Sequence, residues 1–193
     1  ETKNDPAFAE GLAKLGDVYV NDAFGTAHRA HASTEGIARF LPSAAGFLIE
    51  KEVRFFAPLL ENPEQPFVAI IGGAKVSTKI EVLKSLLPKC SSLIIGWGMA
   101  YTFLAVKGHK VGKSLLETDY FETAKEIIIL AEKLNKTLIL PVDHLCGSEF
   151  SEQTQPVEVS GTDIPDNLLG MDVGPKTLSL YKEHISKAKS LVW

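Results

Sequence analysis

Short apolar runs rich in β-branched residues alternate with helical patterns from residue 66 onward, and this alternation constrains the fold of the 193-residue chain more than any other feature. The runs at 67–71, 93–95 and 138–142 have the length and composition of buried parallel strands. Because parallel neighbours need crossover connections, the helices between them are expected to cover the sheet. The pattern predicts an α/β fold with a doubly wound parallel sheet.

Helix-start signals precede the helical stretches of this region. Thr78 with Glu81, and Asp119 with Glu122, have the spacing of capping boxes. Pro175 is typical of the first position of a helix. We therefore expect three of the helices to begin near these residues.

Two further strands are expected toward the end of the sequence. Residues 157–159 read Val-Glu-Val, which favours a short strand, and residues 190–193 resemble the first part of a buried one. The strand expected at 18–20 has no earlier strand to join. The sequence is therefore interpreted as an internal fragment whose sheets lack some of their strands.

The N-terminal part is organised differently. Asp5 and Pro6 suit the N-cap and the first position of a helix that Gly16 should end. A strand at 18–20 follows, and Asn21-Asp22 predicts a turn.

A longer helix is expected between residues 46 and 60. Apolar residues recur there at helical spacing over a wide stripe, which predicts neighbours on more than one side. Pro58 should loosen the last turn, and residues 61–66 have the composition of a linker. A plain core helix is the alternative interpretation.

Composition excludes several classes of protein. The chain is 45% hydrophobic and 23% charged, as in globular proteins, and its longest apolar runs are too short to span a membrane. A net charge of -4 argues against general nucleic-acid binding. Its two cysteines favour reduced thiols and a cytoplasmic location. The segment Asp143-His144-Leu145-Cys146 lacks the paired spacing of a zinc site, so no protein-held metal is expected.

A first candidate anion site follows the strand at 18–20. Arg29 offers a planar fork of donors for a phosphate or carboxylate, and His28 and His31 can add donors and part of a charge. Small residues between them would let a ligand approach the backbone. The alternative is a surface loop with a solvated arginine.

A second candidate site follows the strand at 67–71. The segment Gly72-Gly73-Ala74-Lys75 differs from a Walker A loop, but its small residues would let backbone amides face a phosphate. Lys75 and Lys79 are four apart and would share a helical face if the helix had begun, which suggests a polyphosphate ligand. Two exposed lysines on a solvated helix are the alternative.

Five segments, in order, resemble blocks of the phosphoglycerate kinase family, and the resemblance covers essentially the whole chain. It implies a Rossmann-like three-layer α/β/α domain that binds the nucleotide, with the tail of a second α/β domain and a bridging helix. Residues 1–45 would end the phosphoglycerate-binding domain, 46–65 would form the interdomain helix and linker, and 66–193 would begin the nucleotide-binding domain. The matching segments are 17–33, 72–79, 95–103, 140–143 and 170–175.

The resemblance implies reversible phosphoryl transfer between 1,3-bisphosphoglycerate and ADP, giving 3-phosphoglycerate and ATP in glycolysis. Lys79 would be catalytic, with Lys75 assisting, while Arg29, His28 and His31 would bind the phosphoglycerate. Mg²⁺ would arrive with the nucleotide, held largely by its phosphates. The residues implied to line the nucleotide site are Gly73, Ala74, Lys75, Lys79, Gly98, Gly170 and Met171.

Two departures from the family pattern bear on activity. Trp97 stands where the family usually has the second of three glycines, so its indole either fills the adenosine pocket, covers it, or points into an apolar gap. Blocks that the family places before Glu1 and after Trp193 are absent, so we expect little or no kinase activity from this chain alone.

The family resemblance implies a monomeric full-length protein, whereas an exposed sheet edge would let a fragment self-associate. A noncatalytic scaffold, or a nucleotide-binding module without turnover, is the alternative function. A dinucleotide-dependent dehydrogenase is disfavoured, because no Gly-x-Gly-x-x-Gly opens the first helix of the alternating region.

Overall fold

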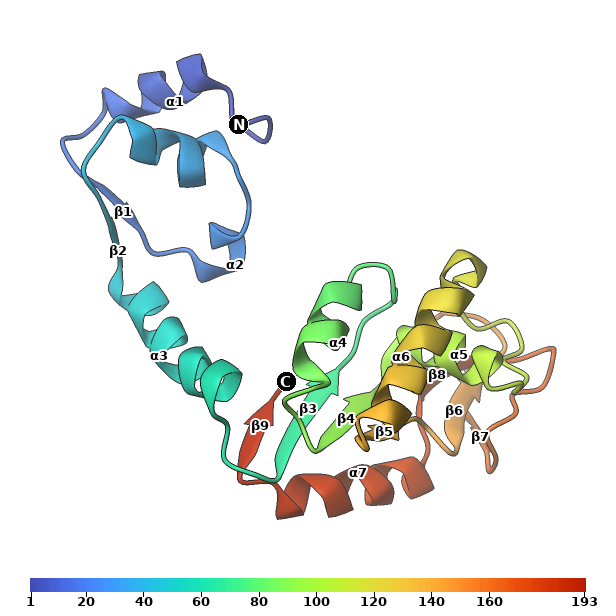
Figure 1. Cartoon of the computed structure of the whole chain (residues 1–193). Coiled ribbons are helices and arrows are strands. Elements are labelled where there is room, and N and C mark those ends of the chain that lie inside the picture. The colour runs from blue at the N-terminus through green and yellow to red at the C-terminus, as the bar shows by residue number, and fades with distance from the viewer. The chain divides into compact units, whose positions relative to one another are not determined.

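The computed structural model describes all residues, 1–193, and divides them into two compact units, Glu1–Glu61 and Asn62–Trp193 (Figure 1). The division falls inside the segment predicted to be the interdomain helix and linker. Each unit is described by itself. None of the helices is long and apolar enough to cross a bilayer.

The first unit contains one two-stranded parallel sheet and several helices. Strands β1 and β2 pair in parallel, with Tyr19 opposite Ser43. The predicted N-cap is confirmed, because the Asp5 carboxylate accepts a hydrogen bond of 2.8 Å from the Phe8 amide. The elements are α1 (Pro6–Ala13), β1 (Tyr19–Asn21), α2 (Phe24–Ala27), the π-helix η1 (Ala32–Gly36), the 3-10 helix η2 (Ile37–Arg39), β2 (Ser43–Ala45) and α3 (Phe47–Glu61).

Helix α3 is the long helix predicted from the apolar stripe. None of its residues is buried, so the alternative of a plain core helix is wrong. The Phe56 ring stacks on Phe24 at 5.7 Å between centroids, and this contact joins α3 to α2. Several other large apolar side chains of α3, Phe47 and Phe55 among them, lie on the surface.

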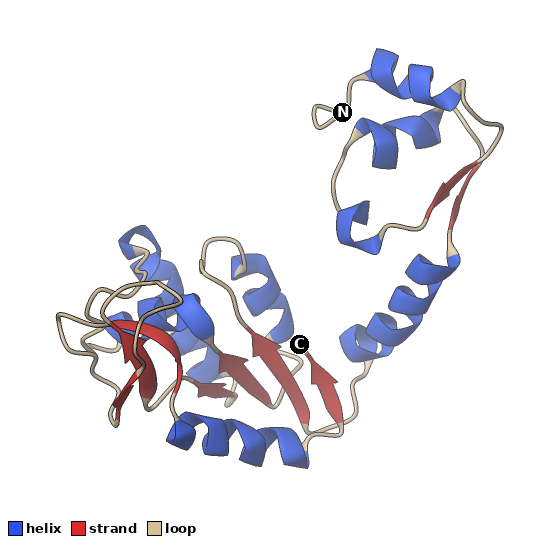
Figure 2. Cartoon of the chain, turned by 180° about the vertical axis from the view of Figure 1, so that it is seen from behind, coloured by secondary structure: helices blue, strands red, loops and turns tan.

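The second unit is built on a four-stranded parallel sheet in the order β5-β4-β3-β9 (Figure 2). The predicted strands are confirmed, although β5 ends three residues earlier than expected. The elements are β3 (Phe67–Ile71), α4 (Ile80–Leu86), β4 (Ser92–Ile95), α5 (Trp97–Val106), the 3-10 helix η3 (Thr118–Tyr120), α6 (Phe121–Lys133), β5 (Thr137–Ile139), β6 (His144–Gly147), β7 (Val157–Val159), β8 (Leu169–Val173), α7 (Pro175–Lys187) and β9 (Ser190–Val192).

Helices cover both faces of this sheet, as the three-layer prediction requires. Helix α7 runs along one face, where Leu180 and Tyr181 pack on Val68, Ile94 and Ile139 (Figure 1). Side chains alternate across a strand, so the neighbouring residues of β3 and β4 point to the opposite face, which carries α4, α5 and α6. Both faces are therefore buried, which explains the continuous apolar runs in the sequence.

A second sheet, antiparallel and ordered β7-β6-β8, was not expected as a sheet. Only β7 was predicted from its pattern. The sequences of β6 (His-Leu-Cys-Gly) and β8 (Leu-Gly-Met-Asp-Val) lack a clean alternation, and a register shift between Leu145 and Cys146 breaks the ladder with β8. Pairing with distant segments, rather than local propensity, makes these residues strands.

Both predicted capping boxes are wrong. The Thr78 hydroxyl donates to the Lys75 carbonyl at 3.0 Å, and Lys79 is the N-cap of α4. Asp119 lies inside η3, and the N-cap of α6 is Tyr120, one residue later. The loop before α4 is held by hydrogen bonds between Ser77 and Glu117, whereas Pro175 opens α7 as predicted.

Candidate functional site

One cavity of about 670 Å³ gathers five of the seven residues that were expected to line a nucleotide site. They come from the loop after β3, from α5 and from β8, which are far apart in the sequence. We call this the glycine-lined cavity. Its lining residues are Gly73, Ala74, Trp97, Gly98, Tyr101, Lys113, Leu115, Phe150, Leu169, Gly170, Met171 and Asp172.

Close backbone contact explains two of these glycines. A Cβ on Gly98 would lie 3.0 Å from the Ala74 carbonyl oxygen, and the Met99 amide donates to the Gly73 carbonyl at 2.9 Å. Gly73 itself has φ +154°, which L side chains rarely adopt. The first turn of α5 is thus packed directly on the loop after β3.

The third glycine makes room for an aromatic side chain. A Cβ on Gly170 would overlap the hydroxyl of Tyr101, which reaches across from α5 to β8. Burial raises the pKa of the Tyr101 phenol, so it stays protonated at neutral pH. Gly170 therefore sets the distance between α5 and the antiparallel sheet at the floor of the cavity.

Lys79 lies at a second, neighbouring cavity of about 620 Å³, which we call the apolar cavity. Lys79 is half-buried there, and its Cε lies 4.0 Å from the position that a Cβ on Gly73 would occupy. The Lys79 side chain therefore runs beside the loop that borders the glycine-lined cavity. The apolar cavity is lined by Ile70, Ile71, Gly72, Lys79, Val82, Ile94, Gly96, Trp97, Asp172, Val173, Tyr181, Ile185, Leu191 and Trp193.

Lys75 is placed differently from the expectation. The helix begins only at Ile80, so Lys75 lies in the loop before the turn at 77–79 and does not share a helical face with Lys79. Lys75 is exposed and lines neither cavity. The interpretation of two lysines on one helical face is wrong, because the turn at 77–79 delays the helix.

The loop that carries both lysines is held by Glu117, a residue that the sequence gave no reason to single out. The Glu117 carboxylate accepts hydrogen bonds from the Ser77 amide at 3.2 Å and from the Ser77 hydroxyl at 2.7 Å. The Glu117 amide in turn donates to the Thr102 hydroxyl of α5 at 3.3 Å. Glu117 therefore ties the loop before α4 to helix α5.

Trp97 and Asp172 are the two residues that line both cavities. Trp97 is 62% exposed, and it borders the apolar cavity as well as the glycine-lined cavity. Its backbone has φ +58°, in the left-handed region. Asp172 is the carboxylate that faces both cavities.

The block at 140–143 serves α7 rather than a ligand. The buried Asp143 carboxylate accepts hydrogen bonds from the Lys176 amide at 2.8 Å and the Thr177 amide at 2.7 Å. Burial alone would raise the pKa of Asp143, but these bonds and that of the Thr177 hydroxyl outweigh it and hold the pKa below its ordinary value. No group of three or more His, Cys, Asp or Glu side chains is placed to hold a metal ion.

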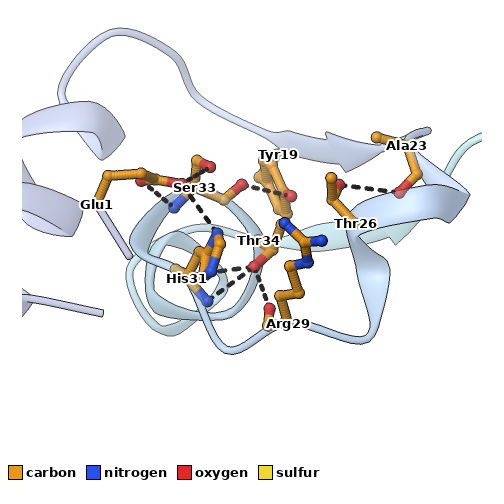
Figure 3. A network of polar contacts seen from close by, with 8 residues as sticks. All are labelled: Glu1, Tyr19, Ala23, Thr26, Arg29, His31, Ser33 and Thr34. Carbon is orange, nitrogen blue, oxygen red and sulfur yellow. Dashed lines mark hydrogen bonds and ion pairs between the residues drawn. The ribbon is translucent and has the colours of Figure 1, made fainter. Parts of the chain in front are cut away.

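In the first unit, Arg29 and His31 flank Thr34 (Figure 3). The Thr34 hydroxyl donates to the Arg29 carbonyl at 2.6 Å and accepts from the His31 amide at 3.1 Å, so both backbones are fixed. The Arg29 guanidinium forms no hydrogen bond or ion pair within the chain. His31 Nδ1 instead lies 3.7 Å from the Glu1 carboxylate. His28 is exposed at the end of α2.

Comparison with known proteins decides the family. The sequence profile described as phosphoglycerate kinase matches residues 1–193, the whole chain. The chain belongs to the phosphoglycerate kinase family.

Curated phosphoglycerate kinases and solved structures agree. The chain is 53% identical over 193 residues to the phosphoglycerate kinase of Borrelia duttonii, and 54% identical over 198 residues to that of Lactobacillus gasseri. Both matches cover all of this chain, but only 49% of the first relative and 48% of the second. The structure of the phosphoglycerate kinase from Coxiella burnetii matches with a TM-score of 0.83 and 41% identity, covering all of this chain and 50% of that one. The structure of the phosphoglycerate kinase from Pyrococcus horikoshii matches with a TM-score of 0.81 and 28% identity. The match covers 97% of this chain and 49% of that one.

The chain thus spans about half the length of the phosphoglycerate kinases that it matches. Within that half, the structure brings Gly73, Ala74, Gly98, Gly170 and Met171 to one cavity and Lys79 to the next. Sequence reasoning missed Glu117, Tyr101, Lys113 and Asp172. Tyr101 and Asp172 gave a signal, since they lie in the segments 95–103 and 170–175 that match the phosphoglycerate kinase pattern.

Proposed function

We propose that this chain belongs to an enzyme that transfers a phosphoryl group reversibly between 1,3-bisphosphoglycerate and ADP, giving 3-phosphoglycerate and ATP in glycolysis, in the cytoplasm. The observation that supports this most is the glycine-lined cavity, where five family-matching residues meet beside Lys79. A cavity of this size suits a nucleoside.

In this proposal the nucleotide binds with its base in the glycine-lined cavity and its phosphates toward Lys79. The ammonium of half-buried Lys79 would offset the charge of the phosphoryl group as it moves, and Lys75 would assist from the exposed loop before the turn at 77–79. No general base is needed, because the carboxylate of 3-phosphoglycerate is ionised at neutral pH. The contribution of the chain is alignment, charge neutralisation and exclusion of water.

Mg²⁺ would come with the nucleotide. The ion usually binds proteins through one or two carboxylates and otherwise through phosphates and water. The donor set fits this division, because Asp172 is the carboxylate that lines both cavities. Asp172 is therefore the residue that would contact the ion carried by ADP or ATP.

Arg29 would bind the phosphoglycerate. Its guanidinium has no partner within the chain, while the Thr34 hydroxyl fixes its backbone carbonyl. His28 is exposed beside it, whereas His31 faces Glu1 and would support the patch less directly. The unpaired fork of Arg29 suits a phosphate or a carboxylate.

Calorimetric titration of the 193-residue chain with Mg·ADP tests the proposal. We expect binding that Lys79→Ala weakens by about tenfold or more, the loss typical of one charge-assisted contact. Lys133→Ala is the matched control, because Lys133 is an exposed lysine of α6 that lines neither cavity. Absence of heat with the unmodified chain would contradict the proposal and favour the noncatalytic scaffold.

Turnover is proposed for the full-length enzyme, since the chain spans only about half of its relatives. A coupled ADP/ATP assay should detect little or no activity from the 193 residues alone. Ordinary turnover would show that this half is sufficient.

We also propose that the full-length enzyme is a monomer, and that the outer edge of β9, which pairs only with β3, lets this chain self-associate. Sedimentation as a monomer at all concentrations would contradict that association.

A further inference from the structure

We propose that the indole of Trp97 is a stacking surface for the nucleotide base and therefore a residue that determines nucleotide affinity in this chain. The inference rests on the proposed function, because it places the base in the glycine-lined cavity. It concerns a residue at which this sequence departs from the glycine of its family pattern. The other interpretation is that the indole obstructs the same cavity.

The backbone at Trp97 is the first observation. Trp97 is the first residue of α5 and has φ +58°, a conformation that bulky residues seldom adopt. Core packing does not explain the strain, because 62% of the residue is exposed. Unexplained strain in an exposed residue beside a cavity is typical of functional positions.

The surroundings of the indole are the second observation. A Cβ on Gly72 would lie 3.7 Å from Cδ2 and 3.8 Å from Cγ of Trp97, so the backbone at Gly72 supports the ring system. The rest of the ring is exposed and lines both cavities. The indole is therefore held on one side and free on another, as a stacking surface requires.

The other walls of the glycine-lined cavity are the third observation. Gly73 and Ala74 have almost no side chains, so a flat ring can approach their backbone, whereas Gly98 and Gly170 are packed on Ala74 and Tyr101. Lys113 lines the same cavity and can contact polar atoms of a nucleoside. The Lys113 backbone is fixed, because its amide donates to the Leu168 carbonyl at 2.7 Å.

Stacking on an indole tolerates different bases, because every base has a π-face. We therefore expect Trp97 to strengthen the binding of Mg·ADP and Mg·GDP by similar factors. Any preference between the two would come from polar contacts such as those of Lys113. This separates the role of Trp97 from that of a base-reading residue.

The test measures the affinity and the fluorescence of one tryptophan. Trp193→Phe leaves Trp97 as the only tryptophan in the chain. In this background, titration with Mg·ADP should quench the emission of Trp97. Trp97→Gly should weaken binding measured by calorimetry by about tenfold, and Trp97→Phe by only about threefold, because a smaller ring still stacks.

Three outcomes would overturn the inference. Equal or tighter binding by Trp97→Gly would show that the indole is absent from the contact or obstructs it. Loss of binding in Phe150→Ala but not in Trp97→Gly would assign the stacking to Phe150, the other exposed aromatic residue of the cavity. Loss of Mg·ADP binding by Trp97→Gly with Mg·GDP binding retained would assign Trp97 to base reading instead of stacking.

The result also separates this inference from the proposed function. If the unmodified chain binds Mg·ADP, Lys79→Ala weakens the binding and Trp97→Gly does not, only the stacking role fails. If neither the unmodified chain nor Trp97→Gly binds, the proposed function fails as well. Circular dichroism melting curves of each variant confirm that the compared chains are folded.

Discussion

Asp143 and Thr177 are joined by four hydrogen-bond contacts that hold the start of α7 against the end of the parallel sheet, one of them from the Asp143 amide to the Thr177 hydroxyl at 3.1 Å. Oδ1 of Asp143 accepts from the Thr177 amide at 2.7 Å, and the single proton of the Thr177 hydroxyl is shared between Oδ1 at 2.5 Å and the Asp143 carbonyl at 3.1 Å. A side chain on Gly174 would overlap this carboxylate. The helix is thus capped by a residue from another part of the chain.

The first unit uses the same arrangement. The Asp22 carboxylate accepts from the amides of Leu48 at 2.7 Å and Ile49 at 3.1 Å, at the start of α3. A side chain on Gly46 would overlap Asp22. In both units a strand is followed by an aspartate that caps a distant helix, and a glycine before the helix provides the space.

Asp143→Ala should lower the free energy of unfolding by about 2–3 kcal/mol, because it leaves the amides at the start of α7 without acceptors in a buried position. Urea unfolding followed by circular dichroism measures the change. Asp166→Ala is the control, since Asp166 is exposed and forms no side-chain hydrogen bond. A loss no larger than that of Asp166→Ala would contradict the capping role.

Gly170→Ala should lower the free energy of unfolding by about 1–3 kcal/mol, because the added methyl group overlaps the buried Tyr101 hydroxyl. The variant should also weaken Mg·ADP binding, since β8 would have to shift at the floor of the glycine-lined cavity. Gly161→Ala is the matched control, because nothing lies within 4 Å of a Cβ at that position. Equal stability of the two variants would refute the close contact.

Glu117→Ala should weaken Mg·ADP binding by about threefold to tenfold with a smaller effect on stability, because Ser77 loses both of its acceptors and the loop that carries Lys79 is released. Glu117→Gln keeps one acceptor oxygen and should retain most of the affinity. Calorimetry on both variants makes the comparison. Identical losses would mean that charge, and not loop anchoring, explains the effect.

Stability should fall as the pH decreases from about 7.5 to about 5.5, with His144 as one cause. The ring is 1% exposed, and burial lowers its pKa below the ordinary value of about 6.5. Below that ordinary value the unfolded chain takes up the proton while the folded chain does not, so stability is lost over this interval. The stabilisation by the Asp143 carboxylate, whose pKa is lowered in the folded chain, is lost only as the pH falls below about 4, where the unfolded form is protonated.

His144→Gln should reduce this pH dependence. Nε2 of His144 lies 3.1 Å from the Thr162 carbonyl, and Nδ1 has no partner, so glutamine can keep a donor there without titrating. Urea unfolding at about pH 7.5 and about pH 5.5 gives the change in the free energy of unfolding between the two pH values, for the unmodified chain and for His144→Gln. An unchanged slope in the variant would show that other groups carry the acid sensitivity.

Local patterns were sufficient to predict much of the second unit. The strands β3 and β4 and the start of α7 follow from apolar runs and from Pro175, because period and proline chemistry are properties of neighbouring residues. The capping boxes at Thr78 and Asp119 had equally good spacing and were wrong. The loop before α4 is instead fixed by a distant contact, between Ser77 and Glu117.

The sequence by itself determined the family, the alternation of strands and helices, and the residue types that suit phosphate binding. Tertiary structure decided which of these residues meet: Gly73, Gly98 and Gly170 share a cavity, whereas Lys75 remains outside it. It also decided that Asp143 caps α7 and that His144 is buried without a partner for Nδ1. Periodicity is encoded by neighbours along the chain, but close backbone contacts, caps and burial depend on segments brought together only by folding.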